Sequence, residues 1–215
     1  MKDLVLVGSG GFFLEICDYF QNDLNKEYIH NVRIKGVIDD YSGSPLEYID
    51  FLGKISEYRV KSNDIFLICI GSPLVRDQLF EQLKKKGAKF YTYIHPSAVV
   101  ANSATLGEGV IICPYAIVNA ESEVADNVLL NINTSVGHQA YIGKSSVLSP
   151  YAAVNGSGKL GQMCFLGSRS TVFPCVSIGN KTIVDSHSYA KYDAGEKKIV
   201  SLRGDYLCVN NRLMR

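Results

Sequence analysis

The sequence lacks long hydrophobic runs and any excess of charge. Apolar runs such as residues 4–7 and 65–70 fall far short of the roughly 20 residues that span a bilayer, and the chain begins without the long hydrophobic region of a signal peptide. Lysine and arginine number 22 and aspartate and glutamate 21, which leaves no basic stripe for nucleic acid or for an anionic membrane. We therefore expect a cytoplasmic protein with no membrane insertion, no nucleic-acid partner and a small molecule as its substrate.

Cysteine pairs and histidine clusters are also missing. The six cysteines show no Cys-x-x-Cys spacing, which favours reduced, mostly buried thiols over a disulfide framework or a zinc site. The chain has four histidines, and only His138 and His187 fall within or near the repeats described below. A site in which three histidines hold one metal is therefore not expected.

The first ninety residues alternate apolar runs with helical stretches. We expect strands at the runs LVLVG, RIKGVID, IFLICIG and KFYTYI, and helices over about residues 12–21 and 74–86. This order predicts an α/β domain over residues 1–94, a small Rossmann-like and mostly parallel sheet.

Glycines close the first strand and open the first helix. Gly10 and Gly11 allow backbone amides to approach a phosphate at a helix N-terminus, which favours negative charge. A full dinucleotide motif would need glycine where Phe13 stands, so a bound NAD is doubtful. Asp39 and Asp40 end the second strand, where carboxylates can accept hydrogen bonds from ribose hydroxyls or a base edge. Glycines and carboxylates are also common in ordinary turns, so a purely structural role stays open for both groups.

From Val100 onward the apolar period is six residues. Fifteen successive positions hold only valine, leucine or isoleucine: Val100, Leu106, Ile112, Val118, Val124, Leu130, Val136, Ile142, Leu148, Val154, Leu160, Leu166, Val172, Ile178 and Val184. An unbroken hexapeptide repeat is typical of a β-solenoid in which each hexad forms one short strand and a turn, and stacked coils bury the aliphatic column. We expect about five triangular coils of eighteen residues each. They occupy residues 95–186 and precede a C-terminal tail, 187–215.

The stretch around the single histidine within the repeats carries a family resemblance. It reads NINTSVGHQAYIG from Asn131, whereas the family motif has Asn, six residues, His, then Asp or Glu, with Ile-Gly shortly after. Asn131, His138, Ile142 and Gly143 match this motif, and Gln139 does not. With its small sheet domain and IHPSA junction, the whole chain resembles bacterial nucleotide-sugar acetyltransferases of the sialic-acid O-acetyltransferase family. It is most similar to those that acetylate 4-amino-4-deoxy sugars on UDP or GDP.

The resemblance implies a left-handed β-helix and a homotrimer with active sites between subunits. Acetyl-CoA is the implied cosubstrate, and a nucleotide-activated amino sugar is the implied partner. The implied catalytic residues are Asn131, His138 and Gln139. The positions that align with nucleotide-sugar contacts are Gly10, Gly11, Phe12, Asp39, Asp40 and Gly71. The positions that align with the CoA lining are Val147, Gly156, Ser168 and Ser186, of which Val147 replaces a histidine found in several relatives.

The repeat itself places His138 away from the core column. It follows the inward-facing Val136 by two residues, and Gly156 lies one coil later, so the absent side chain leaves room for a thioester. A neutral imidazole there can act as a general base, because histidine ordinarily titrates near working pH. A surface histidine without a role is the alternative.

Gln139 makes His138 a weaker base than the histidines of its relatives. A neighbouring carboxylate would fix the tautomer and stabilise the imidazolium, whereas an amide can only orient the ring through a neutral hydrogen bond. Slower catalysis, a carboxylate supplied from elsewhere in the trimer, and loss of activity with retained binding all remain open. We favour slower catalysis, because an amine is already nucleophilic and asks little of its base.

Three other functions compete with N-acetylation of an amino sugar. O-acetylation of a sialic or related sugar is harder for a weakened base, because a hydroxyl is a poorer nucleophile. A non-catalytic, nucleotide-sugar-binding trimer is consistent with Gln139, with Val147 and with a divergent tail. A γ-class carbonic anhydrase has the same type of β-helix but needs three histidines at one metal.

Overall fold

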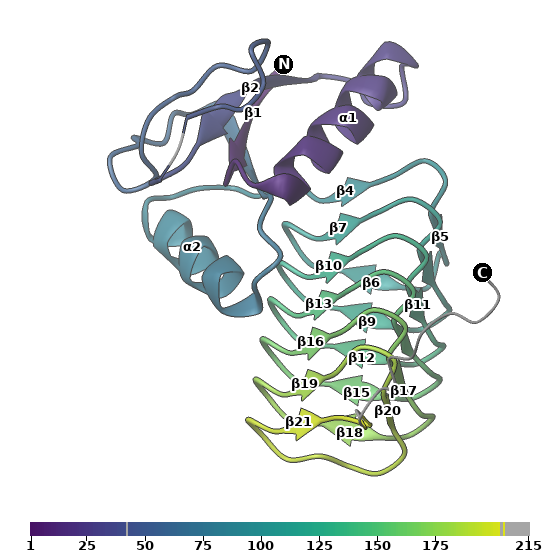
Figure 1. Ribbon diagram of the computed structural model, residues 1–215. Helices are drawn as coiled ribbons and strands as arrows, with labels where there is room; N and C mark the ends of the chain where they lie inside the picture. The colour runs from purple at the N-terminus through teal and green to yellow at the C-terminus, as the bar shows by residue number, and fades with distance from the viewer. Residues whose placement is uncertain (42, 203, 205–215) are drawn as a thin grey trace, which may run out of the picture.

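The N-terminal part of the chain forms a three-stranded parallel sheet with two helices (Figure 1). The computed structural model describes residues 1–41, 43–202 and 204. The strands pair in the order β2-β1-β3. The elements are β1 (Lys2–Val7), α1 (Gly11–Asn25), β2 (Val32–Ile38), β3 (Asp64–Ile68) and α2 (Pro73–Lys85). The expected parallel sheet and both helices are confirmed, but the fourth run contributes only a single bridge to this sheet, between Phe66 and Phe90.

Two apolar clusters hold this sheet domain together. The central strand β1 is buried on both sides from Leu4 to Val7, as is typical of a parallel sheet covered on two faces. One cluster includes Phe13 and Phe20 of α1, and the other includes Phe80 of α2. The first cluster continues into the β-helix, so the two parts of the chain share a core.

Two-residue strands follow, and they stack into three parallel sheets that form the faces of a prism. The seven-stranded face contains β4 (Tyr93–Ile94), β7 (Ile111–Ile112), β10 (Leu129–Leu130), β13 (Val147–Leu148), β16 (Phe165–Leu166), β19 (Ile183–Val184) and β21 (Ile199–Val200). The six-stranded face contains β5 (Val99–Val100), β8 (Ile117–Val118), β11 (Ser135–Val136), β14 (Ala153–Val154), β17 (Thr171–Val172) and β20 (Tyr189–Ala190). The five-stranded face contains β6 (Thr105–Leu106), β9 (Glu123–Val124), β12 (Tyr141–Ile142), β15 (Lys159–Leu160) and β18 (Ser177–Ile178).

The register confirms the hexapeptide interpretation. Leu129 pairs with Val147 and Ser135 with Ala153, so neighbouring strands of each face are eighteen residues apart. From Ile112 to Val184, every member of the aliphatic column is buried in one continuous core, and Val100 and Leu106 pack against its upper end. The chain is therefore a small parallel sheet domain followed by a left-handed β-helix, as expected.

The corners of the β-helix repeat one backbone conformation. From residue 115 to residue 187, every sixth residue has a φ angle between 54° and 63°, in the left-handed region. This conformation costs a non-glycine residue about 1 kcal/mol, and backbone hydrogen bonds to the coil before offset that cost. At Gln139, for example, the backbone N–H donates to the carbonyl of Ala120 at 2.9 Å.

A buried arginine fastens α2 to the β-helix. Arg76 is fully buried, and its guanidinium donates to the carbonyl oxygens of Ile68, Ile70 and Asn127 and to the side-chain oxygen of Asn127. Burial lowers the pKa of Arg76 to about 10. Its hydrogen bonds join the end of β3 to a corner of the β-helix, so this one side chain helps to set how the two parts of the chain pack.

Strand pairing extends beyond the expected limits of the β-helix. It begins with β4, two residues before His95, and continues past residue 186 through β20 and β21. The division at 94 and 186 stays a prediction, and of the tail 187–215, residues 203 and 205–215 lie outside the described residues. Neither helix of the described chain is long and apolar enough to cross a membrane.

Candidate functional site

His138 lies at the corner between the six-stranded and five-stranded faces, against the backbone of Gly156. Its side chain is exposed, and Gly156 occupies the same corner position on the next coil. A Cβ atom placed on Gly156 would lie 2.5 Å from Nε2 and 2.7 Å from Cε1 of His138. Such contacts are too short, so the ring takes this position because residue 156 has no side chain. The eighteen-residue spacing predicts this contact, and the structure contains it.

Gln139 connects His138 to a carboxylate of the preceding coil. Its Oε1 lies 3.4 Å from Nδ1 of His138, and its Nε2 donates to Oε2 of Glu121 at 2.9 Å. Glu121 precedes Gln139 by eighteen residues, so both side chains start from the same corner position. Sequence reasoning missed Glu121, although counting one coil back from Gln139 finds it.

Asn131 lies at a different corner from His138. It follows β10, at the corner between the seven-stranded and six-stranded faces, and its Oδ1 accepts a hydrogen bond of 2.6 Å from the backbone N–H of Ile132. Among the described residues, no hydrogen bond joins Asn131 to His138 within one chain. The resemblance groups these residues in one active site, and a single chain leaves them at two corners.

The positions expected to line CoA divide between the same two corners. Ser168 and Ser186 stack one coil apart at the corner of Asn131, and Gly156 lies at the corner of His138. Val147 begins β13 on the seven-stranded face, where its side chain is 3% exposed inside the core shared with the sheet domain. This burial leaves Val147 almost no surface for a ligand.

The residues expected to bind the nucleotide sugar gather at the carboxyl ends of β1, β2 and β3. A Cβ atom placed on Gly10, Gly11 or Gly71 would meet no other atom within 4 Å, so the backbone there is open. Phe12, in the first turn of α1, is half-buried and packs against the core of the sheet domain. The strands run parallel, so these loops follow their carboxyl ends and lie at one edge of the sheet.

The two carboxylates at this edge support the neighbouring loops. Oδ2 of Asp39 accepts hydrogen bonds from the backbone N–H of Ser9 at 2.8 Å and from its hydroxyl at 2.9 Å. Oδ1 of Asp40 accepts weaker bonds from the backbone N–H and the hydroxyl of Ser56, at 3.2 and 3.3 Å. Asp39 therefore holds the glycine turn after β1 in place. This is the structural role that stayed open for this carboxylate from the sequence alone.

Several hollows surround this edge. Hollows of about 230 Å³ and about 300 Å³ are both lined by Asp39, Asp40 and Tyr41. A third, of about 530 Å³, opens at the start of α2. It is lined by Gly71, Ser72, Pro73, Leu74, Met163, Phe165, Lys181, Ile183 and Lys197. The sheet edge thus has space for a small molecule next to the lower coils of the seven-stranded face.

Metal-ligating groups do not cluster in the part of the chain that the structure describes. No three histidine, cysteine, aspartate or glutamate side chains are arranged there to hold an ion. The described cysteines are free thiols: Cys17, Cys69, Cys113 and Cys164 are buried and Cys175 is exposed. Burial raises the pKa of the Cys17 thiol to about 12, which suits a structural residue.

Comparison with known sequences gives a partial match. No protein-family model matches the chain. Over 120 residues, 52% of this chain, it is 34% identical to the UDP-N-acetylbacillosamine N-acetyltransferase of Bacillus subtilis (strain 168). The match spans about half (51%) of that relative, so it does not by itself establish what the whole chain does.

Comparison with solved structures covers almost the whole chain. PerB from Caulobacter crescentus, solved in complex with CoA and GDP-perosamine, is 24% identical with a TM-score of 0.83, over 95% of this chain and 98% of PerB. The resemblance to nucleotide-sugar N-acetyltransferases is confirmed. The acetyltransferase domain of PglB from Neisseria gonorrhoeae FA1090 is 20% identical with a TM-score of 0.82, over 93% of this chain and 96% of that domain. At these identities, the likeness to solved structures establishes the fold, including the placement of a sheet domain before a β-helix.

Proposed function

We propose that this protein is an acetyl-CoA-dependent N-acetyltransferase. Its substrate in this proposal is the amino group of a nucleotide-linked 4-amino-4-deoxy sugar, a precursor of a surface glycan. One observation carries the proposal: an exposed histidine whose Nε2 lies against the bare backbone of Gly156, on a β-helix that follows a small parallel sheet domain. The names of the matched relatives support the same chemistry.

His138 acts as the general base in this proposal. The amine nitrogen of the sugar attacks the carbonyl carbon of the thioester, and Nε2 of His138 takes the amine proton as the new C–N bond forms. The C–S bond then breaks, and the proton passes from the imidazolium to the CoA sulfur. Gly156 helps to position the base because it has no side chain: a Cβ atom there would displace the imidazole of His138.

The nucleotide part of the substrate binds at the sheet edge in this proposal. Open backbone at Gly10, Gly11 and Gly71 suits close approach of a diphosphate, and α1 begins directly at Gly11. Asp40 is exposed beside two hollows, where its carboxylate can accept from a ribose or a base. CoA would follow Gly156, Ser168 and Ser186, and Val147 would not take part because it is buried.

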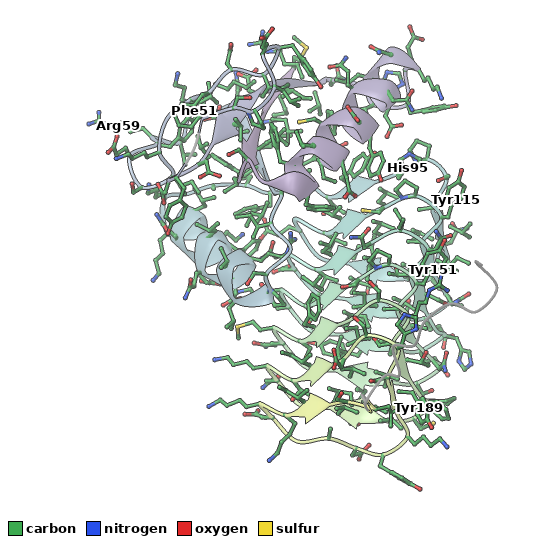
Figure 2. All side chains as sticks on the ribbon, in the orientation of Figure 1. Phe51, Arg59, His95, Tyr115, Tyr151 and Tyr189 are labelled. Atoms are coloured by element: carbon green, nitrogen blue, oxygen red, sulfur yellow. The ribbon has the colours of Figure 1, made fainter. Side chains whose placement is uncertain are left out.

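A homotrimer completes the site in this proposal. The outward residues of the six-stranded face carry no charge: Val99, Ile117, Ser135, Ala153, Thr171 and Tyr189. Val99 and Ile117 expose 61% and 40% of their surface, and Figure 2 shows Tyr115 and Tyr151 along the adjoining side of the β-helix. Asn131 and His138 flank this face from its two corners, so packing against copies of itself would bring one corner of each kind together.

The trimer has a direct test. Ile117→Glu places a charge on the six-stranded face, and we expect the mass measured by light scattering to fall from three chains to one at micromolar protein. The matched control is Thr105→Glu, on the exposed five-stranded face. A monomeric wild-type chain would contradict the shared site.

The activity is tested by CoA release. The purified chain is incubated with acetyl-CoA and with UDP-, GDP- or dTDP-linked 4-amino sugars, and CoA is quantified by chromatography. We expect release with one nucleotide, and His138→Ala should lower kcat by roughly 10² to 10⁴ with little change in the KM for acetyl-CoA. His30→Ala, an exposed histidine of the sheet domain, is the control. Release only with sugars that lack the amine would favour O-acetylation, and thermal stabilisation without release would favour a binding protein.

A further inference from the structure

Glu121, Gln139 and His138 form a continuous line of polar side chains on one corner of the β-helix, here called the polar line. Glu121 and Gln139 both have φ angles of 57° and stack on consecutive coils. The backbone N–H of Glu121 donates to Oγ of Ser103 at 3.1 Å, and that of Gln139 donates to the carbonyl of Ala120 at 2.9 Å. Glu121 and Gln139 therefore each start from a backbone position that the preceding coil holds by a hydrogen bond.

Hydrogen-bonding capacity fixes the direction of the polar line. A carboxylate can only accept, so the amide group facing Glu121 must be the donating NH₂ of Gln139, at 2.9 Å. The carbonyl Oε1 of Gln139 then faces Nδ1 of His138 at 3.4 Å. An amide oxygen can only accept, so this contact is a hydrogen bond only when Nδ1 carries the proton, which leaves Nε2, the atom against Gly156, with its lone pair.

We propose that Glu121 is the carboxylate that supports His138, acting through Gln139. Glu121 and Gln139 are then positioning residues. The inference rests on the proposed function, because it assigns the support of the base in that reaction. The amide transmits polarity: its NH₂ bonds to an anion, which makes its carbonyl oxygen a stronger acceptor for the imidazole N–H. When His138 takes up a proton, Nδ1–H still faces the oxygen of Gln139. Glu121 therefore stabilises the positive charge of the imidazolium indirectly, through the Gln139 amide.

The polar line explains how a chain with glutamine beside its histidine can retain a carboxylate. A carboxylate supplied from elsewhere in a trimer is one alternative that stayed open from the sequence, and here the same chain supplies the carboxylate from the preceding coil. Both Glu121 and Gln139 are exposed, and the Nδ1 contact is long, so water weakens the effect. We therefore expect a modest contribution, smaller than that of a directly bonded carboxylate.

The first test reads the tautomer of His138 and does not require activity. Histidine in water favours the Nε2–H tautomer, whereas the polar line requires Nδ1–H. Long-range proton–nitrogen correlation spectra of ¹⁵N-histidine-labelled protein at about pH 8 report the tautomer, and His138→Gln identifies the signals. We expect Nδ1–H in the wild type and a shift toward Nε2–H in Glu121→Ala. Glu121→Gln should keep Nδ1–H, because its amide oxygen can still accept from Gln139.

Glu123→Ala is the matched control for the spectra. Glu123 is an exposed carboxylate two residues away, on the neighbouring five-stranded face, and its loss should leave the tautomer unchanged. The inference is overturned if the wild type shows Nε2–H, or if Glu121→Ala and Glu123→Ala give the same spectrum.

The second test separates a positioning role from a structural one. Glu121→Ala and Glu121→Gln should lower kcat by about three- to tenfold, far less than His138→Ala, with each KM unchanged within about twofold. In a Gln139→Met background, Glu121→Ala should cause no further loss, because the connection is already broken. Equal losses in both backgrounds would show that Glu121 acts independently of Gln139 and would overturn the inference.

The two tests keep the inference and the proposed function apart. A chain that releases no CoA with any amino sugar, but shows a Glu121-dependent tautomer, contradicts the proposed function and supports the polar line. A chain that acetylates normally and shows no Glu121 dependence in tautomer or kcat supports the proposed function and refutes the polar line.

Discussion

Gly156 shows how a missing side chain can position a catalytic candidate. Its φ angle lies outside the left-handed region, so glycine is not needed there for backbone freedom. A Cβ atom would instead meet the imidazole of His138, at the flexible end of a side chain. The requirement for glycine is therefore steric, and an added methyl group should move the ring while leaving the coil intact.

We predict that Gly156→Ala lowers kcat by at least about tenfold, because a shift of about 1 Å in a catalytic group commonly costs more than that. The thermal midpoint should change little, since the ring can swing into solvent. Enzyme kinetics and thermal denaturation of the same sample check both points. Ser157→Ala, at the next residue of the corner, is the control, and full activity in Gly156→Ala would show that this ring position is not the reactive one.

Gln139 illustrates the limit of judging a residue by its sequence neighbours. Beside His138 in sequence it appears as a neutral replacement for a carboxylate. In the folded chain, its amide lies between His138 and Glu121, eighteen residues earlier. The relevant neighbour comes from the stacking of coils, so the amide and the carboxylate have to be considered together.

At the scale of elements, the corners of the β-helix from residue 115 to residue 187 combine a residue in the left-handed conformation with a hydrogen bond to the preceding coil. Residues as different as Glu121, Ser145 and Arg169 adopt the same left-handed conformation at equivalent positions. The aliphatic column, rather than the corner residue, specifies the coil, because it is the part that each hexad buries. Corner positions are therefore available for function without loss of the fold.

The junction before the first full coil depends on a neutral histidine. His95 is half-buried against Tyr19 and Tyr93, and its Nδ1 accepts a hydrogen bond of 3.1 Å from the backbone N–H of Ser97. Burial lowers the pKa of His95, so the folded protein resists protonation at pH values where the unfolded chain accepts a proton. Protonation of Nδ1 would also remove the acceptor for Ser97.

We predict that His95 makes the protein less stable in mild acid. Below about pH 6.5 the unfolded chain binds a proton that the folded chain excludes, so the free energy of unfolding falls as pH decreases. In His95→Asn, the side-chain oxygen can replace Nδ1 as acceptor without titrating. Urea midpoints at about pH 7.5 and about pH 5.5 should therefore differ less in this variant than in the wild type. Equal acid sensitivity in both proteins would contradict the prediction.

At the scale of the whole molecule, the sheet domain covers only the upper part of one β-helix face. Ile111, Leu129 and Val147 of the seven-stranded face are at most 3% exposed beneath it, whereas Ile199, at the lower end, is 70% exposed. Figure 1 shows α2 beside these upper coils. This packing joins the two parts through an apolar surface, and Arg76 adds the polar connection.

We predict that Arg76→Met lowers the free energy of unfolding by about 3 kcal/mol, because it leaves buried carbonyl groups without their donor. Urea unfolding followed by circular dichroism checks this value. Arg33→Met is the matched control, since Arg33 pairs with Asp3 at the surface and such pairs contribute at most about 1 kcal/mol. Equal losses in the two variants would mean that Arg76 does not fasten the domains.

The sequence by itself determined the architecture of this protein. A six-residue aliphatic period has one structural solution, and its eighteen-residue coil also predicted that Gly156 meets His138. Alternating strands and helices predicted the parallel sheet, with Gly10 and Asp39 at the ends of its strands. These features follow from local periodicity, which a single sequence displays directly.

Only the tertiary structure decided which side chains meet across coils and domains. Only there does Glu121 bond to Gln139, and only there does Asp39 accept hydrogen bonds from the turn after β1. Val147 is buried, and Asn131 and His138 lie at separate corners. The tertiary structure also showed that a fully buried Arg76 joins two parts that look independent in sequence. The physical reason is that periodicity specifies which face a residue occupies, whereas hydrogen-bond partners and burial between domains depend on distances between segments remote in the chain.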